Sequence, residues 1–394
     1  MKILVICQYY YPEPFRITDI CEEWVKQGHT VQVVTGLPNY PMGKLYSGYE
    51  NGENRDEVIN GVQVHRCFEI PRKNGILYRF LNYYSYSWSA KKYVRKIKEQ
   101  FDIVFVNQLS PIMMAEPALT YKRKNKTKMV LYCLDLWPES LIAGGIQRGS
   151  FLYKHYHKVS KRIYQAADKI AVTSRLFKNY FVEQFDINED KISYLPQYAE
   201  DLFENVDCER DTQEEINLLF AGNIGQAQSV ETIIRAAAET TDLVNLHWHI
   251  VGDGSALDAC KQLASEWNAN NIVFHGRKAL EEMPEFYKNA DAMLVTLMDD
   301  DVLSLTLPGK VQTYMAAGKP ILAAANGEIA FILDKANCGF CVNAEDYQGL
   351  ADKARAFCAL DVETRERYSQ NAKQFYKDNF SKAIFFEKVD ELIK

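Results

Sequence analysis

Three short glycine-containing turns in the second half of the chain have the composition of a diphosphate-binding edge. Gly222–Gly225 follows the apolar run Ile216–Ala221, and similar turns stand at Gly252–Gly254 and Gly276–Arg277. Small residues at a strand-to-helix turn let backbone N–H groups approach a diphosphate, whose charge the helix N-terminus favours. One such turn alone is as typical of an ordinary tight turn as of a ligand site. Three of them in order predict a ligand site.

Polar side chains in the first half also follow apolar runs. The loop Tyr9–Arg16, after Ile3–Cys7, carries Glu13 and Arg16 among aromatic residues but lacks the glycines of a dinucleotide fingerprint. It therefore argues against NAD and favours substrate contact, with a packed aromatic turn as the alternative. Asp135 follows Met129–Cys133 in the same way.

The elements that must position these residues are short strands alternating with helical stretches. This alternation predicts two parallel sheets with crossover helices, an α/β fold of two Rossmann-like domains with ligands beyond the carboxyl ends of the strands. We therefore expect the site in a cleft between the domains. The expected strands are Ile3–Cys7, Val31–Thr35, Val62–Cys67, Ile103–Val106, Met129–Cys133 and Ile170–Val172, then Ile216–Ala221, Leu246–Val251, Ile272–Phe274, Ala292–Val295, Ile321–Ala324 and Gly339–Val342.

Length supports two domains, because a single core rarely grows beyond about 250 residues. The polar, acidic stretch from Ile192 to Glu215 is interpreted as a linker, and a helical pattern closes the chain with a break near Asn379–Ser381. We predict one domain at 1–197, a second domain at 198–372 and a helix at 373–394 that returns toward the first domain.

Charge is distributed unevenly along the chain. Residues 1–200 carry a formal net charge of +8 and residues 201–394 carry −14. This division argues against nucleic acid as a partner, which would favour one continuous basic stripe. We find no leader-like segment and no apolar run of about 20 residues, so we expect a cytoplasmic protein whose membrane contact is peripheral.

Aromatic residues followed by a lysine–arginine run suggest where that contact would occur. They extend from Arg72 to Lys98, and a second basic patch covers Lys122–Lys128. Such a segment suits anionic lipid headgroups, while a solvated basic helix face is the alternative. A lipid-linked acceptor at the inner face of the membrane would explain it.

The ordered motifs GNIG, VGDG, FHGR, NADAMLVT and YMAAGKP resemble the carboxy-terminal domain of family 4 glycosyltransferases. The resemblance covers essentially the whole chain and implies retaining, metal-independent enzymes of GT-B architecture. YYYPE, GLPNYP and LDLWPES, which begin at Tyr9, Gly36 and Leu134, look like the WbuB-type subfamily, associated with N-acetyl-L-fucosamine transfer in bacterial surface polysaccharides.

The resemblance implies that the first domain binds the acceptor and that the second binds the nucleotide-sugar. It also implies roles for residues at matching positions. Gly276 and Arg277 would hold uracil, and Asp135 would face the reacting sugar. Together with the residues after the strands, the predicted catalytic set is Asp135, Lys310, Glu13 and Arg16, and the predicted donor-binding set is Gly222, Asn223, Ile224, Gly225, Gln228, Gly252, His275, Gly276, Arg277, Thr306, Leu307, Gln312, Thr313 and Tyr314.

The chain departs from the family pattern at four positions. Asn223 and Gln228 replace an arginine and a lysine, and Leu305 and Thr313 replace two glutamates. Because charge that develops on the departing diphosphate needs a cation, we expect Lys310 to supply it, assisted by Arg277 or Arg16. A solvated lysine at a helix start is the alternative.

We expect no cofactor and no metal. The acidic triplet Asp299–Asp301 could suggest Mg²⁺, but three consecutive acids point in different directions and are typical of a loop.

The prediction is a retaining glycosyltransferase that moves a sugar, such as N-acetyl-L-fucosamine, from a UDP-sugar to an undecaprenyl-diphosphate-linked saccharide in capsule or O-antigen synthesis. A nucleotide-sugar 2-epimerase of the same fold and a catalytically silent donor-binding scaffold are the alternatives.

Overall fold

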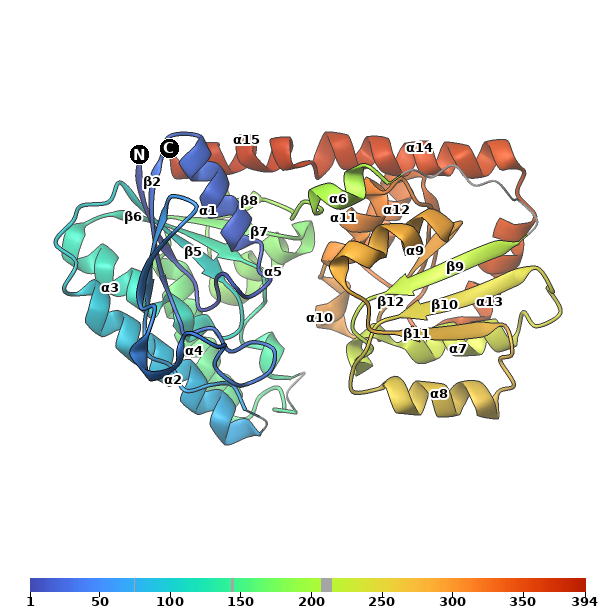
Figure 1. The fold of residues 1–394 in the computed structure, drawn as a ribbon, viewed down its shortest axis with the longest axis horizontal. Coiled ribbons are helices and arrows are strands. Elements are labelled where there is room, and N and C mark those ends of the chain that lie inside the picture. Colours follow the sequence, from blue (N-terminus) through green and yellow to red (C-terminus); the bar gives the residue numbers. More distant parts are fainter. Residues whose placement is uncertain (74, 143–144, 207–214) are drawn as a thin grey trace. The chain divides into compact units, whose positions relative to one another are not determined.

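The computed structural model describes residues 1–73, 75–142, 145–206 and 215–394 (Figure 1). These residues divide into two compact units. The first contains Met1–Val172, Phe177–Tyr194 and Asp390–Lys394, and the second contains Thr173–Leu176 and Leu195–Val389. Part of the expected linker, with Cys208, lies outside the described residues.

The first unit is built on an eight-stranded sheet in the order β3-β4-β2-β1-β5-β6-β7-β8. All neighbours pair in parallel except β3 and β4. The strands are β1 (Lys2–Ile6), β2 (Thr30–Thr35), β3 (Asp56–Ile59), β4 (Val62–Arg66), β5 (Ile103–Gln108), β6 (Lys128–Cys133), β7 (Lys169–Val172) and β8 (Ile192–Tyr194).

The helices that connect these strands are amphipathic. In α1, for example, Ile17, Ile20, Cys21 and Trp24 are buried, and Gly28 follows its end with φ +87°, the left-handed conformation that favours glycine. The helices of this part of the chain are α1 (Ile17–Lys26), α2 (Ile76–Val94), α3 (Glu116–Asn125), α4 (Phe151–Ala166) and α5 (Arg175–Phe185), with short 3-10 turns at Glu50–Gly52, Ile112–Ala115, Glu139–Leu141 and Glu189–Lys191.

The second unit has a six-stranded parallel sheet in the order β11-β10-β9-β12-β13-β14. The order reverses between β9 and β12, which creates the crevice that α/β proteins use for ligands. The strands are β9 (Ile216–Ala221), β10 (Leu246–Val251), β11 (Ile272–Gly276), β12 (Ala292–Thr296), β13 (Ile321–Ala324) and β14 (Gly339–Val342).

The helices of this part of the chain are α6 (Asp201–Glu204), α7 (Val230–Ala238), α8 (Leu257–Glu266), α9 (Met283–Asn289), α10 (Asp301–Ser304), α11 (Gly309–Ala316), α12 (Glu328–Ala336), α13 (Tyr347–Cys358), α14 (Val362–Asn379) and α15 (Lys382–Ile393), with 3-10 turns at Gln226–Gln228 and Leu280–Glu282. The second unit has a hydrophobic core that includes the fully buried Trp248 and residues of α7, α8 and α13.

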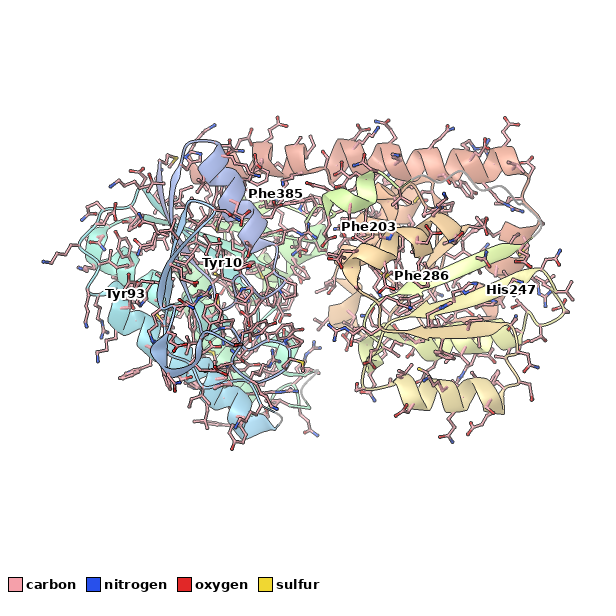
Figure 2. All side chains as sticks on the ribbon, in the orientation of Figure 1. Tyr10, Tyr93, Phe203, His247, Phe286 and Phe385 are labelled. Carbon is pink, nitrogen blue, oxygen red and sulfur yellow. The ribbon has the colours of Figure 1, made fainter. Side chains whose placement is uncertain are left out.

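Continuous apolar strands explain the two cores. Ile3–Ile6 of β1 are 0% exposed, as expected for a parallel strand covered on both faces. Trp24 of α1 meets Phe105 of β5 edge-to-face at 5.1 Å, and Tyr10 lies in the interior of the same unit (Figure 2).

The expected α/β fold with two Rossmann-like sheets is confirmed, and all twelve expected strands are present. Two further strands, β3 and β8, were missed. The interpretation of Ile192 as the start of the linker was wrong, because Ile192–Tyr194 pairs with β7 as the last strand of the first sheet. This strand is three residues long and follows the polar turn Glu189–Lys191, so it carried no periodic signal.

The end of the chain is helical with a break, as expected, since α14 ends at Asn379 and α15 begins at Lys382. Asp390–Lys394 belong to the first unit, so the chain returns to the unit in which it began. Both chain ends lie there side by side (Figure 1), with His29 in electrostatic range of Asp390 and of the amino terminus.

Candidate active site

The glycine turns of the second unit lie on three adjacent strands at one edge of its sheet. Gly222 donates its N–H to the Val251 carbonyl at 2.9 Å, and Ile224 donates to the Asp253 carbonyl at 2.9 Å. Gly252 donates to the Gly276 carbonyl, also at 2.9 Å. The turns after β9, β10 and β11 therefore form one hydrogen-bonded edge at the carboxyl ends of the strands.

Close approach of backbones explains the glycines in these turns. A Cβ on Gly252 would lie 1.8 Å from the Gly222 carbonyl oxygen, and one on Gly254 would lie 2.3 Å from the Ile224 carbonyl oxygen. Gly222 and Gly252 also have φ +149°. Side chains cannot enter here without moving the backbone, so backbone rather than side chains forms the contact between these turns.

Lys310 places its ammonium group within this edge. Its Nζ donates to Gln228 Oε1 at 2.6 Å and lies 4.0 Å from the centroid of the Phe220 ring. A Cβ on Gly222 would be only 3.2 Å from the same Nζ. Burial lowers the pKa of Lys310 to about 7, because the charged form is poorly solvated there.

The contact between Lys310 and Gln228 lies at a position where the family resemblance implies a cation. Gln228 stands where the family pattern has a lysine, and the ammonium group that contacts Gln228 comes instead from the first turn of α11. Thr296 at the end of β12 donates to the Gln228 carbonyl at 2.6 Å, which fixes the 3-10 turn Gln226–Gln228. A solvated lysine at a helix start does not describe this half-buried side chain.

Other residues predicted to bind the donor hold the protein together instead. The Tyr314 hydroxyl is fully buried, donates to the Ala221 carbonyl at 3.0 Å and accepts from the Ala221 N–H at 3.1 Å. Leu307 is 4% exposed and Gln312 is 1% exposed. We do not retain these three as ligand contacts, because their side chains are enclosed by protein.

Two threonines of the predicted donor-binding set, Thr306 and Thr313, lie in the segment that contains Lys310. Thr306 is half-buried and donates to the Val302 carbonyl at 3.2 Å, whereas Thr313 is 8% exposed and donates to the Gly309 carbonyl at 3.1 Å. Thr306 is therefore the more accessible of the two.

His275 lies near the carboxyl end of β11, and Arg277 directly follows that strand. One ring nitrogen of His275 lies 2.9 Å from His249, and Phe286 meets its ring edge-to-face at 5.1 Å. Burial lowers the pKa of His275, so the neutral ring is favoured. Arg277 is exposed, and Gly276 has φ +69° with open space where a Cβ would lie.

The acidic triplet has local structural partners. Asp300 caps α10 by accepting from the N–H groups of Val302 and Leu303 at 2.8 and 3.0 Å, and Asn326 donates to Asp299 at 2.9 Å. Within the part of the chain that the structure describes, no group of three or more His, Cys, Asp or Glu residues is placed to hold a metal ion.

Asp135 lies at the carboxyl edge of the first unit's sheet, directly after β6. Its carboxylate accepts from Ser140 Oγ at 2.5 Å, and Ser110, which follows β5, also hydrogen-bonds to it. Ser110 Oγ in turn accepts from the Trp137 indole at 2.5 Å. Burial raises the pKa of Asp135 above its ordinary value, while these hydroxyls and the positive charge of Arg72 oppose the rise.

Glu13 and Arg16 contribute differently from what was predicted. Glu13 is 3% exposed, and its Oε1 accepts from the N–H groups of Asn39 and Tyr40 at 2.9 and 2.7 Å. Burial raises its pKa to about 7. Glu13 therefore fixes the loop after β2, and we do not retain it as catalytic. Arg16 is half-buried and immediately precedes α1.

Sequence reasoning missed Glu69, a second buried carboxylate. It is 1% exposed, accepts from Gln8 at 3.3 Å and also accepts from the Asn39 amide. Burial raises its pKa well above the ordinary value. An acidic residue so soon after β4 was the signal available. Its partners tie together the loops that follow β1, β2 and β4.

Glu139 in the LDLWPES motif is structural. It is 4% exposed and accepts from the hydroxyls of Tyr153 and Tyr180, both at 2.7 Å, and from Arg148 at 2.9 Å. These contacts hold the segment that carries Asp135 against α4 and α5.

The basic aromatic segment forms one face of α2. Tyr78, Leu81, Tyr84 and Trp88 are 42, 40, 46 and 64% exposed, and their spacing of three or four residues puts them on one side of the helix. Lys92 and Arg95 continue that side, and Lys92 Nζ lies 5.7 Å from the Trp88 ring. We call these six residues the α2 stripe.

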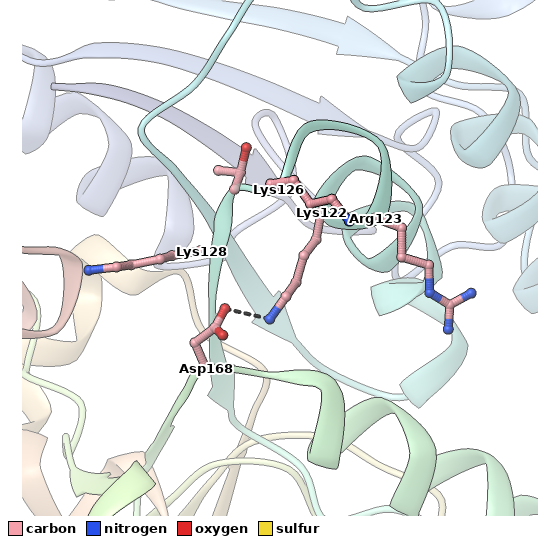
Figure 3. Close-up of a pocket in the computed structure, with 6 residues that line it drawn as sticks. Lys122, Arg123, Lys126, Lys128 and Asp168 are labelled. Carbon is pink, nitrogen blue, oxygen red and sulfur yellow. Dashed lines mark hydrogen bonds and ion pairs between the residues drawn. The ribbon is translucent and has the colours of Figure 1, made fainter.

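The second basic patch lies at the opposite end of the strands from Asp135. Lys122, Arg123, Lys126, Thr127, Lys128 and Asp168 line a pocket of about 290 Å³ at the amino ends of β6 and β7 (Figure 3). Lys122 Nζ donates to Asp168 at 2.5 Å and to the Ala166 carbonyl at 2.8 Å. This patch is therefore separate from the candidate site.

None of the described helices combines the length and the apolar character that a bilayer crossing requires.

Two family models together match most of the chain. Residues 16–197 match the model described as Glycosyltransferase Family 4, and residues 207–375 match Glycosyl transferases group 1. The two matched ranges correspond to the sheets that carry Asp135 and Lys310.

Individual relatives agree with the family models. The chain is 27% identical to the probable glycosyltransferase WbjE of Pseudomonas aeruginosa, over 86% of each protein. It is 24% identical to the putative colanic acid biosynthesis glycosyl transferase WcaI of Escherichia coli, over 89% of this chain and 90% of the relative. HepE of Anabaena, solved in complex with UDP and glucose, has the same fold, with a TM-score of 0.72 at 14% identity over 100% of this chain and 99% of HepE.

Fold, motif order and family models agree over both halves of the molecule. The chain belongs to the family 4, group 1 glycosyltransferases, retaining and metal-independent enzymes of GT-B architecture.

Proposed function

We propose that this glycosyltransferase moves an N-acetylated amino sugar, such as N-acetyl-L-fucosamine, from a UDP-sugar to a lipid-linked saccharide in bacterial surface-polysaccharide synthesis. The observation that carries the donor half is the ammonium group of Lys310 inside the glycine-turn edge, 2.6 Å from Gln228 Oε1. A cation beside close-packed glycine turns at the carboxyl ends of strands suits a diphosphate.

The donor is assigned to the second unit. Gly222–Gly225 and Gly252 would approach the diphosphate, with Asn223, Gln228 and Thr306 nearby, and the Gly276–Arg277 turn would receive the base. The UDP bound to HepE, a protein of the same fold, supports uridine as that base. Lys310 would stabilise the negative charge that develops on the diphosphate as the bond to the sugar breaks.

The acceptor is assigned to the first unit, where Asp135 is the half-buried carboxylate at the carboxyl edge of the sheet. The acceptor hydroxyl forms the new bond on the face that the diphosphate leaves, and its proton departs with UDP. Asp135 would stabilise the positive charge that the sugar ring gains during this exchange.

The names of the relatives support the pathway class. WcaI is named for colanic acid, a surface polysaccharide, and WbjE is named as a glycosyltransferase. The YYYPE, GLPNYP and LDLWPES segments support the choice of sugar, since they resemble the WbuB-type subfamily. The domain limits 1–197, 198–372 and 373–394 remain part of the proposal.

A peripheral position on the cytoplasmic face of the inner membrane completes the proposal. The α2 stripe has aromatic side chains for the lipid interface and cations for anionic headgroups. A protein docked in this way reaches an undecaprenyl-diphosphate-linked acceptor at the membrane surface.

A thermal-shift screen of UDP, GDP, ADP and NAD tests the donor assignment. A ligand that binds only the folded state raises Tm by mass action, and we expect UDP to raise it most. Equal shifts with GDP or ADP would refute the assignment to uridine. No shift with any nucleotide would refute the donor site on the second unit.

A further inference from the structure

Arg72 stands at the carboxyl edge of the first unit's sheet without a carboxylate partner. The loop after β4 brings its guanidinium beside the Tyr9 hydroxyl, and its Cζ lies 5.9 Å from the centroid of the Tyr83 ring. Arg72 is half-buried, Tyr9 is 2% exposed and Tyr83 is 7% exposed. Among the described residues, no carboxylate oxygen lies within 4 Å of the Arg72 guanidinium nitrogens.

A buried network of hydrogen bonds holds the backbone of this arginine in place. The Arg72 N–H donates to Asn39 Oδ1 at 2.8 Å, and the Asn39 amide donates to the buried Glu69. Gln8 donates to the same carboxylate at 3.3 Å and to Asn82 at 2.9 Å. The Arg72 backbone is thus anchored through Asn39 to a buried network of hydrogen bonds, as expected for a residue that is held in place to bind a ligand.

Asp135 is near Arg72 but is already satisfied by other groups. The guanidinium is among the charges that act on Asp135, yet the carboxylate takes its hydrogen bonds from Ser110 and Ser140. A half-buried guanidinium with a neutral tyrosine lining is costly to leave without an anion, and its planar donors match phosphate oxygens.

We propose that Arg72 binds the diphosphate of the lipid-linked acceptor and thereby places the acceptor sugar beside Asp135. This inference rests on the proposed function, because it assigns a substrate group to the acceptor site. Recognition of the diphosphate would make the enzyme select acceptors that are still attached to their lipid carrier.

Equilibrium binding of farnesyl diphosphate tests the proposal without requiring sugar transfer. The full-length protein is first saturated with UDP, so that the probe cannot occupy the glycine-turn edge, and is then titrated in a calorimeter. We expect Arg72→Gln to weaken binding about tenfold or more, the effect of losing a charge-assisted pair. Arg72→Lys should lose less, because it keeps the charge but not the planar fork.

Arg367→Ala is the matched control, since it removes an exposed arginine from α14 in the other unit. Its affinity should stay within about twofold of the parent protein. Equal weakening in Arg72→Gln and Arg367→Ala would overturn the proposal, and so would unchanged binding in Arg72→Gln at an unchanged Tm.

Two further probes identify the group that is recognised. Farnesol should bind with no dependence on Arg72, whereas inorganic pyrophosphate should show the same dependence as farnesyl diphosphate. If pyrophosphate binds as tightly as farnesyl diphosphate, the site recognises a free anion and the assignment to a lipid-linked acceptor falls. A protein that binds farnesyl diphosphate through Arg72 but is not stabilised by UDP would refute the donor assignment while leaving this inference intact.

Discussion

At the scale of single residues, the candidate site depends on charges that burial makes unusual. Burial lowers the pKa of Lys310 to about 7, and it raises the pKa of Asp135 above its ordinary value. Both groups are half-buried, Asp135 in the segment after β6 and Lys310 in the first turn of α11, beside the turn after β9. Perturbed titration at such a position is typical of residues that meet a ligand.

Lys310→Met should reduce kcat/KM about 100-fold, because stabilisation of the leaving diphosphate is lost. UDP affinity gives a second readout. A lysine with a pKa of about 7 is mostly protonated at pH 6 and mostly neutral at pH 8, and only the protonated form attracts the diphosphate. The parent protein should therefore bind UDP more tightly at pH 6 than at pH 8.

Lys310→Met also serves as the control for the titration of UDP itself, since it retains every other group. A pH dependence of UDP affinity that is identical in the parent and in Lys310→Met would contradict the role of Lys310. Turnover within about twofold of the parent would contradict it as well.

Asp135→Asn should lower kcat about 100-fold, because the amide keeps the size of the side chain but removes its negative charge. The stabilisation by UDP should be unchanged, since the donor is assigned to the other unit. Enzyme assays and thermal shifts on the same preparation check both expectations. A lost UDP shift with unchanged kcat would contradict the assignment.

At the scale of elements, the turns after β9, β10 and β11 show how sheet geometry dictates residue type. Neighbouring parallel strands bring the turns into backbone contact, and a side chain fits at some glycine positions but not at others. Gly254 has no space for a Cβ, whereas Gly276 has open space but a positive φ.

Gly254→Ala should therefore destabilise the protein by about 2 kcal/mol or more, because the methyl group meets the Ile224 carbonyl. Gly276→Ala should cost about 1 kcal/mol, the strain of a left-handed alanine. Urea denaturation of the two variants measures the difference. A larger loss in Gly276→Ala than in Gly254→Ala would show that backbone contact does not control this edge.

At the scale of the whole molecule, charge is segregated along the chain, with +8 on residues 1–200 and −14 on residues 201–394. The basic half carries the α2 stripe, and the acidic half carries the glycine turns. Electrostatic attraction to an anionic surface would therefore act on the first unit and not on the second.

Replacing Tyr84 and Trp88 together with glutamate should abolish sedimentation with vesicles that contain phosphatidylglycerol, because both interfacial aromatics are lost and negative charge is added. Val244→Glu, a change at an 81% exposed position in the second unit, is the control and should sediment like the parent. Equal vesicle binding by the double variant and the control would rule out the α2 stripe as the membrane surface.

The sequence by itself determined the fold class and the positions of the turns. Continuous apolar runs such as Ile216–Ala221 are typical of buried parallel strands, and their spacing leaves room for crossover helices. The ordered turns at Gly222, Gly252 and Gly276 were likewise visible, because close backbone approach demands glycine. The family resemblance added the reaction class, which the family models support.

Only the tertiary structure decided which polar residues are available for chemistry. Tyr314, Gln312 and Glu13 have polar side chains, but each is at most 3% exposed because side chains and backbone from distant segments enclose it. Conversely, Lys310 and Gln228 are 82 residues apart and meet at 2.6 Å. Local sequence does not encode burial or long-range contacts of this kind, because they arise only when separate strands and helices pack together.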